Sequence, residues 1–262
     1  MSLAGKVAIV TGSATGVGAG CALLLARNGV NVVINYTKSL AEAEETEKAC
    51  AAEGVETLLV QGDISVDADC RRLADAATAK WGRIDILVNN AGTTKFAAHS
   101  DLEALDAEDF HKIYAVNVVG TYQMTRAAAP ALKASGEGSV IMISSVAGLS
   151  GIGSSIAYAA SKGALNTMTM SLARSLAPEV RVNAICPSMI ETRWLREGYG
   201  EERYESLKKR LEDSIPLGRV SKPEDIAQTV LWLVSGANLT TGETIRLDGG
   251  AHLGPRVLTK RL

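Results

Sequence analysis

Short, almost wholly apolar runs alternate along the chain with longer segments in which apolar residues recur at helical spacing. The short runs are rich in valine and isoleucine, which favour strands, and polar residues or glycines bound them. We therefore predict strands at 6–11, 31–35, 57–61, 84–89, 139–144, 180–185 and 243–247. The longer segments predict helices at 17–28, 40–53, 67–81, 106–134, 156–177 and 223–235, with a polar helical insertion near 199–213.

Strands that are apolar throughout and separated by helices are typical of a parallel sheet covered on both faces. The expected fold class is α/β, a doubly wound parallel sheet of the Rossmann type, with about seven strands and helices on both faces. No low-complexity linker and no change in composition divides the chain. We therefore predict a single domain over residues 1–262.

The composition narrows the class of protein. The chain has 262 residues, of which 47% are hydrophobic and 21% charged, with a net charge of −2. No basic surplus indicates nucleic acid or a membrane surface, and no signal peptide or membrane-spanning run is apparent, so we expect a cytoplasmic protein without either partner. Its cysteines and histidines are isolated from one another in sequence, which predicts buried free thiols and no metal site. These residues are Cys21, Cys50, Cys70, Cys186, His99, His111 and His252.

Three glycines lie between the first predicted strand and the first predicted helix, in the stretch TGSATGVG. Gly12, Gly16 and Gly18 would let backbone N–H groups approach a pyrophosphate at the positive end of the helix. Their G-x-x-x-G-x-G spacing differs from the usual G-x-G-x-x-G, and ordinary turn chemistry is the alternative. Taken alone, the stretch leaves both interpretations open.

Polar residues follow the next strands at the same predicted edge of the sheet. Asp63 comes after the third strand, where its carboxylate could accept a proton from an adenine amino group or cap the next helix. Residues 89–92, Asn-Asn-Ala-Gly, follow the fourth strand and offer amide groups and space to a ribose. Both features favour a dinucleotide site.

The end of the second strand bears on which dinucleotide is bound. An NAD site commonly has an acid there, whereas this chain has Asn35, Thr37 and Lys38. Because these side chains can donate hydrogen bonds to a 2′-phosphate, we predict NADP(H), with NAD(H) as the alternative. Thr15 stands where a basic residue would have strengthened the prediction.

Tyr158 and Lys162 are four residues apart in a predicted helix, so they lie on one helical face. A nearby ammonium stabilises a phenolate, and we expect it to lower the pKa of the tyrosine toward the working range. Ser145 would then hold a carbonyl or alcohol oxygen during proton exchange. A surface helix pair is the alternative, because Tyr204 and Lys208 repeat the spacing within a charged run.

The stretches TGSATGVG, NNAG and YAASK, together with Asn117 and Ser145, resemble the short-chain dehydrogenase/reductase family, most nearly its 3-oxoacyl-[acyl-carrier-protein] reductases. The resemblance implies a catalytic tetrad of Asn117, Ser145, Tyr158 and Lys162. In it the tyrosine is the general acid and base, and the serine orients the carbonyl oxygen. The lysine binds the nicotinamide ribose and lowers the tyrosine pKa, and the asparagine supports a proton relay through water.

The resemblance also implies nicotinamide contacts after the sixth strand, from Pro187, the Ile190 backbone and Thr192. Ser188 replaces the glycine that the family usually has there, and serine tolerates fewer backbone angles. The complete predicted cofactor site is Gly12, Ser13, Thr15, Gly16, Val17, Gly18, Asn35, Tyr36, Thr37, Lys38, Asp63, Ile64, Asn90, Ala91, Gly92, Tyr158, Lys162, Pro187, Ile190 and Thr192.

The polar segment at about 188–215 resembles the family's substrate lid, with Trp194 and Leu195 as expected pocket walls. An exposed helix without a role in substrate binding is the alternative. The helices at 106–134 and 156–177 resemble those that pair subunits in the family, which implies a homotetramer or homodimer.

The function implied is an NADP(H)-dependent interconversion of a ketone and a secondary alcohol by hydride transfer. A 3-oxoacyl thioester is the expected substrate class. The alternatives are a sugar, a polyol or another small ketone, used with NADP(H) or NAD(H), and, more remotely, a sensor that binds a dinucleotide without catalysis.

Overall fold

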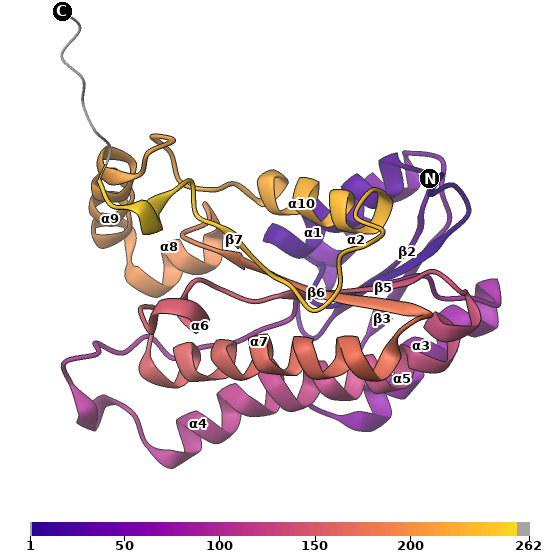
Figure 1. Cartoon of the computed structure of the whole chain (residues 1–262), viewed down its shortest axis with the longest axis horizontal. Helices are drawn as coiled ribbons and strands as arrows, with labels where there is room; N and C mark the ends of the chain where they lie inside the picture. Colours follow the sequence, from indigo (N-terminus) through magenta and orange to yellow (C-terminus); the bar gives the residue numbers. More distant parts are fainter. Residues whose placement is uncertain (1, 256–262) are drawn as a thin grey trace, which may run out of the picture.

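Seven parallel strands form the centre of the protein (Figure 1). The structure is a computed structural model that describes residues 2–255. Across the sheet the strands follow the order β3-β2-β1-β4-β5-β6-β7. Their bounds are β1 (Val7–Val10), β2 (Asn31–Tyr36), β3 (Thr57–Gln61), β4 (Ile86–Asn89), β5 (Gly138–Ile143), β6 (Val180–Pro187) and β7 (Thr244–Leu247). The predicted doubly wound parallel sheet is confirmed.

Helices cover both faces of the sheet (Figure 1). One face carries α1 (Gly16–Arg27), α2 (Leu40–Ala51) and α10 (Pro223–Ser235). The other carries α3 (Asp67–Trp81), α4 (Ala107–Tyr114), α5 (Thr121–Ala134) and α7 (Ile156–Leu176). The remaining helical elements are η1 (Leu102–Ala104), η2 (Ala115–Gly120), α6 (Ala147–Ser150), α8 (Arg193–Tyr199), α9 (Glu201–Ser214) and η3 (Ala251–Leu253). No helix within residues 2–255 is long and apolar enough to cross a membrane.

The buried apolar side chains form one cluster on each face of the sheet. Along β1, Val7 and Ile9 belong to one cluster, and Ala8 and Val10 belong to the other. This alternation arises because successive side chains of a strand point to opposite faces. Both faces are covered, so both sets of positions are apolar, as the sequence pattern predicted.

A third cluster lies apart from the sheet, beneath α9. Its buried members are Met189, Tyr204, Ile215 and Val220. They come from the loop after β6, from α9 and from the chain that follows α9. Through Tyr204, the α8–α9 segment, residues 193–214, therefore packs on an apolar cluster that is separate from the two faces of the sheet.

Two helical regions differ from the sequence prediction. The long helix predicted at 106–134 is interrupted by η2, a π-helical turn between α4 and α5. The polar helix predicted near 199–213 is α9, but a further helix, α8, precedes it and was not predicted; the chain passes between the two at Gly200 with a φ of +77°. Glycine adopts such angles readily, so it separates the two helices at low cost.

The strand order places a crevice at the carboxyl edge of the sheet. From β1 the chain goes to β2 on one side, while β4 pairs with β1 on the other side. The loops that follow β1 and β4 therefore diverge around a topological switch point, where ligands of doubly wound sheets bind.

Candidate active site

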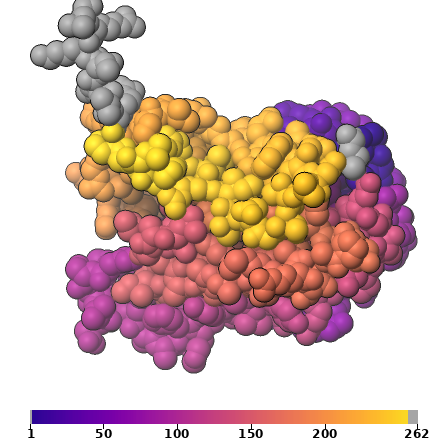
Figure 2. Space-filling view, viewed as in Figure 1, coloured from indigo at the N-terminus to yellow at the C-terminus, as the bar shows by residue number. Residues whose placement is uncertain are grey.

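A cavity of about 1070 Å³ lies along this edge of the sheet. Its walls come from the loops after β1, β2, β3, β4, β5 and β6, and from α8 and α9. In the space-filling view, the α8–α9 segment (orange) and the chain after β4 (magenta) border an indentation at the left of the molecule (Figure 2). The predicted lid residues Trp194 and Leu195 both line the cavity.

The glycine-rich turn packs tightly against the loop after β4. Gly12 has a φ of +61°, and a Cβ there would lie 3.0 Å from the Cα of Ala91. A Cβ on Gly18 would lie 2.6 Å from Nδ2 of Asn90, which donates hydrogen bonds of 2.9 Å to the carbonyls of Thr11 and Gly12. Larger residues at either glycine would force the two loops apart.

The N-terminus of α1 lies at the cavity. Thr15 is the N-cap residue but makes no side-chain capping hydrogen bond. Thr15, Gly16 and Val17 all line the cavity. Uncapped N–H groups at a helix N-terminus, together with the helix dipole, suit an anionic ligand.

Asn35 has a structural role that its position in the sequence does not reveal. Its Oδ1 accepts a hydrogen bond of 3.0 Å from the N–H of Gly12, and its Nδ2 donates to the carbonyls of Val60 and Gly62. Both amide hydrogens are therefore already used inside the protein, and the residue is 2% exposed. The prediction that this side chain donates to a 2′-phosphate is corrected: it ties the glycine-rich turn to β3.

The remaining residues after β2 differ in their access to the cavity. Thr37 lines it, whereas Tyr36 and Lys38 do not. Tyr36 is half-buried and packs against the apolar cluster beneath α1 and α2, and Lys38 is exposed. Thr37 is thus the side chain of this loop that is best placed to contact a ligand.

Asp63 lines the cavity, and its carboxylate holds a turn in the chain after β3. Oδ1 accepts hydrogen bonds of 2.9 Å from the Ser65 N–H and 2.7 Å from its hydroxyl. The N-cap of α3 is Val66, with no side-chain capping bond. The alternative that Asp63 caps this helix is therefore wrong.

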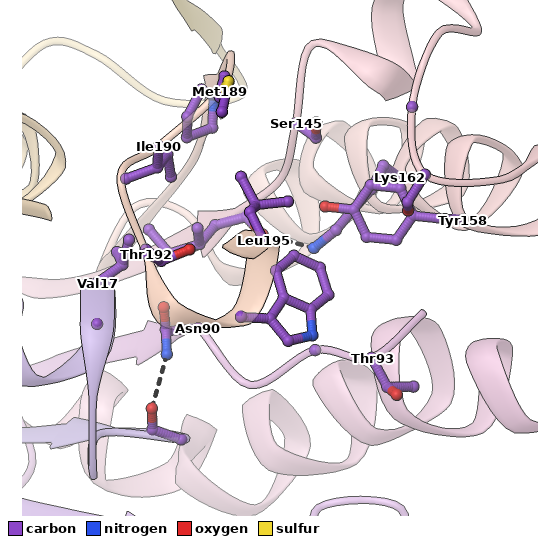
Figure 3. A pocket seen from close by; sticks show the side chains of 18 of the residues that line it. Val17, Asn90, Thr93, Ser145, Tyr158, Lys162, Met189, Ile190, Thr192 and Leu195 are labelled. Carbon is purple, nitrogen blue, oxygen red and sulfur yellow. Dashed lines mark hydrogen bonds between the residues drawn. The ribbon is translucent and has the colours of Figure 1, made fainter. Parts of the chain in front are cut away.

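Tyr158, Lys162 and Ser145 meet at one wall of the cavity (Figure 3). Nζ of Lys162 lies 5.6 Å from the centre of the Tyr158 ring and donates a hydrogen bond of 2.8 Å to the carbonyl of Ile143. The neighbouring Ser144 points elsewhere, because its hydroxyl donates a 2.6 Å hydrogen bond to Asn166. Of the two serines, Ser145 is the one hydrogen-bonded with Tyr158.

The pKa of Tyr158 differs from the sequence prediction. Burial raises the pKa of Tyr158 to about 12, although the hydrogen bond with Ser145 opposes the rise. Burial also lowers the pKa of Lys162 to about 8, because an ammonium loses hydration inside the protein. The expected lowering of the tyrosine pKa is therefore wrong for this structure: loss of hydration raises this pKa, and the hydrogen bond with Ser145 opposes the rise only in part.

Asn117 lies in the π-helical turn behind the cavity wall. Its Oδ1 accepts a 2.8 Å hydrogen bond from the Thr93 N–H, and its Nδ2 donates 3.0 Å hydrogen bonds to the Thr93 carbonyl and the Ser161 hydroxyl. The residue is 1% exposed and does not line the cavity. In this arrangement Asn117 fixes the loop after β4 to the helix that carries Tyr158 and Lys162.

Aromatic side chains join the α8–α9 segment to the rest of the site. The Trp194 ring centre lies 6.2 Å from that of Tyr158, and the Phe96 ring centre lies 4.8 Å from that of Tyr199. A Cβ on Gly198 would overlap the Phe96 ring. No pattern in the sequence indicates a role for Phe96 or Tyr199, because their partners are distant in sequence.

The second tyrosine–lysine pair forms no comparable site. Tyr204 is 1% exposed within the third cluster, and Lys208 forms an ion pair of 2.8 Å with Glu191. Neither residue lines the cavity. The pair serves the packing of α9.

Most of the predicted cofactor residues do line the cavity. They are Gly12, Thr15, Gly16, Val17, Asn35, Thr37, Asp63, Ile64, Asn90, Ala91, Gly92, Tyr158, Lys162, Pro187, Ile190 and Thr192. The predicted residues that do not line it are Ser13, Gly18, Tyr36 and Lys38. Ser13 is fully buried, and its hydroxyl donates a hydrogen bond to the Val10 carbonyl and accepts one from the Asn35 N–H. It therefore supports the glycine-rich turn.

Comparisons with known proteins agree with this geometry. A family model described as Enoyl-(Acyl carrier protein) reductase matches residues 12–252. The candidate ketoacyl reductase 2 of the granaticin polyketide synthase of Streptomyces violaceoruber is 44% identical over 247 residues, which are 94% of this chain and 96% of that protein.

Two solved structures are also similar. A candidate short-chain dehydrogenase/reductase from Burkholderia xenovorans has a TM-score of 0.89 and 42% identity, covering 95% of this chain and 98% of that one. NAD⁺-bound xylitol dehydrogenase has a TM-score of 0.87 and 26% identity, covering 95% and 100%.

Proposed function

The chain belongs to the short-chain dehydrogenase/reductase family, whose members interconvert CH–OH and C=O groups with NAD or NADP, and on this basis we propose that it is an NADP(H)-dependent ketone reductase acting on 3-oxoacyl thioesters. The observation that carries the proposal is the meeting of Tyr158, Ser145 and Lys162 at one wall of a cavity whose other end is the glycine-rich turn.

The residues of the cavity fit a nicotinamide dinucleotide. The close approach of Gly12 to Ala91 and the uncapped N-terminus of α1 suit a pyrophosphate. Pro187, Ile190 and Thr192 line the wall between this turn and Tyr158, where they would hold the nicotinamide. When bound, the cofactor supplies the hydride that the carbonyl carbon accepts.

The proton of the reduction comes from the chain itself. Because its pKa is raised to about 12, the Tyr158 phenol is protonated at neutral pH and can donate to the carbonyl oxygen. The Ser145 hydroxyl is placed to donate a hydrogen bond to the same oxygen, which orients the carbonyl. The Lys162 ammonium favours the negative charge that develops on the phenol as its proton leaves.

The preference for NADP(H) rests on the loop after β2. This loop carries Thr37 toward the cavity and no acid, so no carboxylate repels a 2′-phosphate. NAD(H) is the alternative cofactor, because xylitol dehydrogenase, a structural relative, binds NAD⁺. Steady-state kinetics with both reduced cofactors separate the two, and a kcat/KM with NADH at least equal to that with NADPH would reject the preference.

The substrate class is supported by the ketoacyl reductase relative and by the acyl-carrier-protein description of the matching family model. A sugar or polyol is the alternative, favoured by the likeness to xylitol dehydrogenase. The test is a substrate panel that follows absorbance of the reduced nicotinamide. Turnover of acetoacetyl thioesters is expected; failure to reduce them, alongside turnover of another ketone, would exclude the thioester class.

We further propose that residues 188–215 act as a substrate lid. Trp194 and Leu195 line the cavity, and Arg193 forms an ion pair of 3.2 Å with Glu42 on α2. A lid of this kind excludes water from the reacting carbonyl.

We also propose that the chain forms a homotetramer or homodimer through the outer faces of η2, α5 and α7. Val119, Tyr122 and Met170 are 50%, 45% and 49% exposed there, which leaves apolar surface for a second copy. Light scattering should show an oligomer, and a monomer would count against the proposal. The four buried cysteines are free thiols, which suits the cytoplasm.

A further inference from the structure

One face of α9 forms a wall of the cavity, and it combines apolar and cationic side chains. Arg203, Ser206, Leu207, Arg210 and Leu211 all line the cavity. Their spacing of three and four residues places them on one side of the helix. The leucines are half-buried against the third cluster, whereas both arginines are exposed.

Within residues 2–255 the two arginines have no acidic partner, unlike Arg193, Arg196 and Lys208. Lys209 is also unpaired there, but it does not line the cavity. Arg196 forms ion pairs with Glu201 and Glu205 on the adjacent helix. Among residues 2–255, Arg203 contacts only the ring of Tyr199, at 5.4 Å, and Arg210 has neither a hydrogen bond nor an ion pair. Their charges are therefore available to a ligand.

The cavity itself offers these cations no neutralising group. Asp63 is the one acidic residue among the described residues that line the cavity, and it lies in the turn after β3, beside the glycine-rich end. The chain as a whole has a net charge of −2. A cavity wall with two unpaired arginines is thus a local feature that the average charge of the protein does not explain.

We propose that Arg203 and Arg210 bind an anionic group of the substrate, a phosphate or carboxylate, carried beyond an apolar portion that lies against Leu207 and Leu211. The arginines are seven residues apart, about 10 Å along the helix. An extended substrate can reach them from the reacting carbonyl, whereas a small ketone cannot engage both. Guanidinium groups bind phosphate and carboxylate oxygens through paired N–H donors, which suits this task.

This proposal deepens the proposed function and rests on it, because the phosphate-bearing arm of a 3-oxoacyl thioester supplies such a group. The arm carries the same phosphate whether it is free or attached to a carrier protein. The site would recognise the anion in either case. A carrier-bound substrate can show separately whether the arm arrives free or attached to a carrier protein.

The experiment compares two substrates that differ only in the anion, acetoacetyl-4′-phosphopantetheine and acetoacetyl-pantetheine. The measured quantity is the ratio of their kcat/KM values at saturating NADPH. We expect the wild-type enzyme to favour the phosphorylated substrate and the R203Q/R210Q variant to reduce the ratio at least about fivefold, in line with one partly exposed ion pair. The wild-type ratio should also fall as salt is added.

Lys209→Gln is the matched control, because Lys209 is an exposed cation on the same helix that does not line the cavity. It removes one positive charge from α9 and should leave the ratio unchanged. An R203Q/R210Q ratio equal to that of the wild type would overturn the proposal. An equal loss in K209Q would also overturn it, because the effect would then come from the general field of the helix.

Failure of the proposed substrate class gives a different result. If neither thioester is reduced, the substrate class is rejected, and the same comparison is made with a long-chain ketone that ends in a carboxylate and with its methyl ester, so that the anion can still reach the arginines. A charge preference that depends on Arg203 and Arg210 in that pair would still support anion recognition. A ratio insensitive to both arginines would reject it.

Discussion

The ammonium nitrogen of Lys162 lies 5.6 Å from the centre of the Tyr158 ring. Its hydrogen bond of 2.8 Å goes to the Ile143 carbonyl at the end of β5. The lysine is therefore held against the sheet and faces the phenol ring, while burial acts on both groups and favours their neutral forms. The protein thus places a lysine amine and a phenol side by side in surroundings that disfavour the ammonium of one and the phenolate of the other.

Replacing Tyr158 with phenylalanine removes the proposed proton donor and keeps the ring that packs near Trp194. We expect kcat for ketone reduction to fall by about 10² to 10⁴, the usual contribution of a general acid. The dissociation constant for NADPH, measured by fluorescence titration, should change little. Wild-type turnover in this variant would show that another group supplies the proton.

Replacing Lys162 with methionine removes a buried cation. A fall in pKa from 10.5 to about 8 corresponds to about 3 kcal/mol at neutral pH, and the lost hydrogen bond to Ile143 offsets about 1 kcal/mol of it. We expect the free energy of unfolding to rise by about 2 kcal/mol at pH 7, with activity lost. Urea denaturation measures the first effect and steady-state kinetics the second.

The control for this prediction is the pH dependence of the difference in unfolding free energy between Lys162→Met and the wild type. Between about pH 8 and 10.5, the lysine holds its proton in the unfolded chain and loses it in the folded protein. The unfolded state binds more protons there, so the wild-type stability rises with pH through this window. By pH 10.5 the stability difference should fall by about 3 kcal/mol, from about +2 to about −1 kcal/mol, because the cost of the buried cation disappears and the lost hydrogen bond remains. A constant difference between pH 7 and 10.5 would argue against a desolvated cation.

Substituting Thr37 with aspartate tests cofactor choice. The side chain lines the cavity after β2, so a carboxylate there would repel a 2′-phosphate and accept hydrogen bonds from ribose hydroxyls. We expect the ratio of kcat/KM for NADPH to that for NADH to fall by more than about tenfold, or about 1.4 kcal/mol. Thr37→Asn, of the same size as aspartate but neutral, should retain the preference.

Gly198→Ala tests the aromatic contact that holds α8. A Cβ at this position would overlap the Phe96 ring, so the ring must leave its place beside Tyr199 and Trp194. Because the substrate-side wall loosens while the glycine-rich turn is untouched, we expect KM for the ketone to rise several-fold and the NADPH dissociation constant to stay unchanged.

The double variant Phe96→Ala/Gly198→Ala supplies the control for this contact. Removing the ring abolishes the overlap, so adding Gly198→Ala to Phe96→Ala should change KM less than adding it to the wild type. Independent, additive effects of the two substitutions would mean that the ring and the glycine do not act through each other.

The sheet and its covering helices were predictable because the relevant information is local. Each buried strand is a continuous apolar run, and each helix repeats its apolar positions every three or four residues. Gly200 shows the limit of this reasoning. Whether a glycine ends a helix depends on its φ, and the charged sequence on either side of it continues a helical pattern.

The identities of the site residues were largely predictable from the sequence, but their hydrogen-bond partners and pKa values were less so. Tyr158, Lys162 and Ser145 could be placed together because a strand end and a helical repeat fix them. The role of Asn35 depends on Gly12 and Gly62, which the fold alone brings to it. The rise in the Tyr158 pKa depends on burial, a property of the whole cavity that no spacing encodes.

The cluster of Met189, Tyr204, Ile215 and Val220 gives the segment above the cavity a packing surface that is distinct from the two apolar layers beside the sheet. Its side chains can be exchanged without repacking the two layers that support the sheet. Grafting a foreign α8–α9 segment onto this scaffold would therefore redirect which ketone is reduced while the dinucleotide half keeps its architecture. Diversification of such an enzyme, by evolution or by engineering, has a natural starting point there.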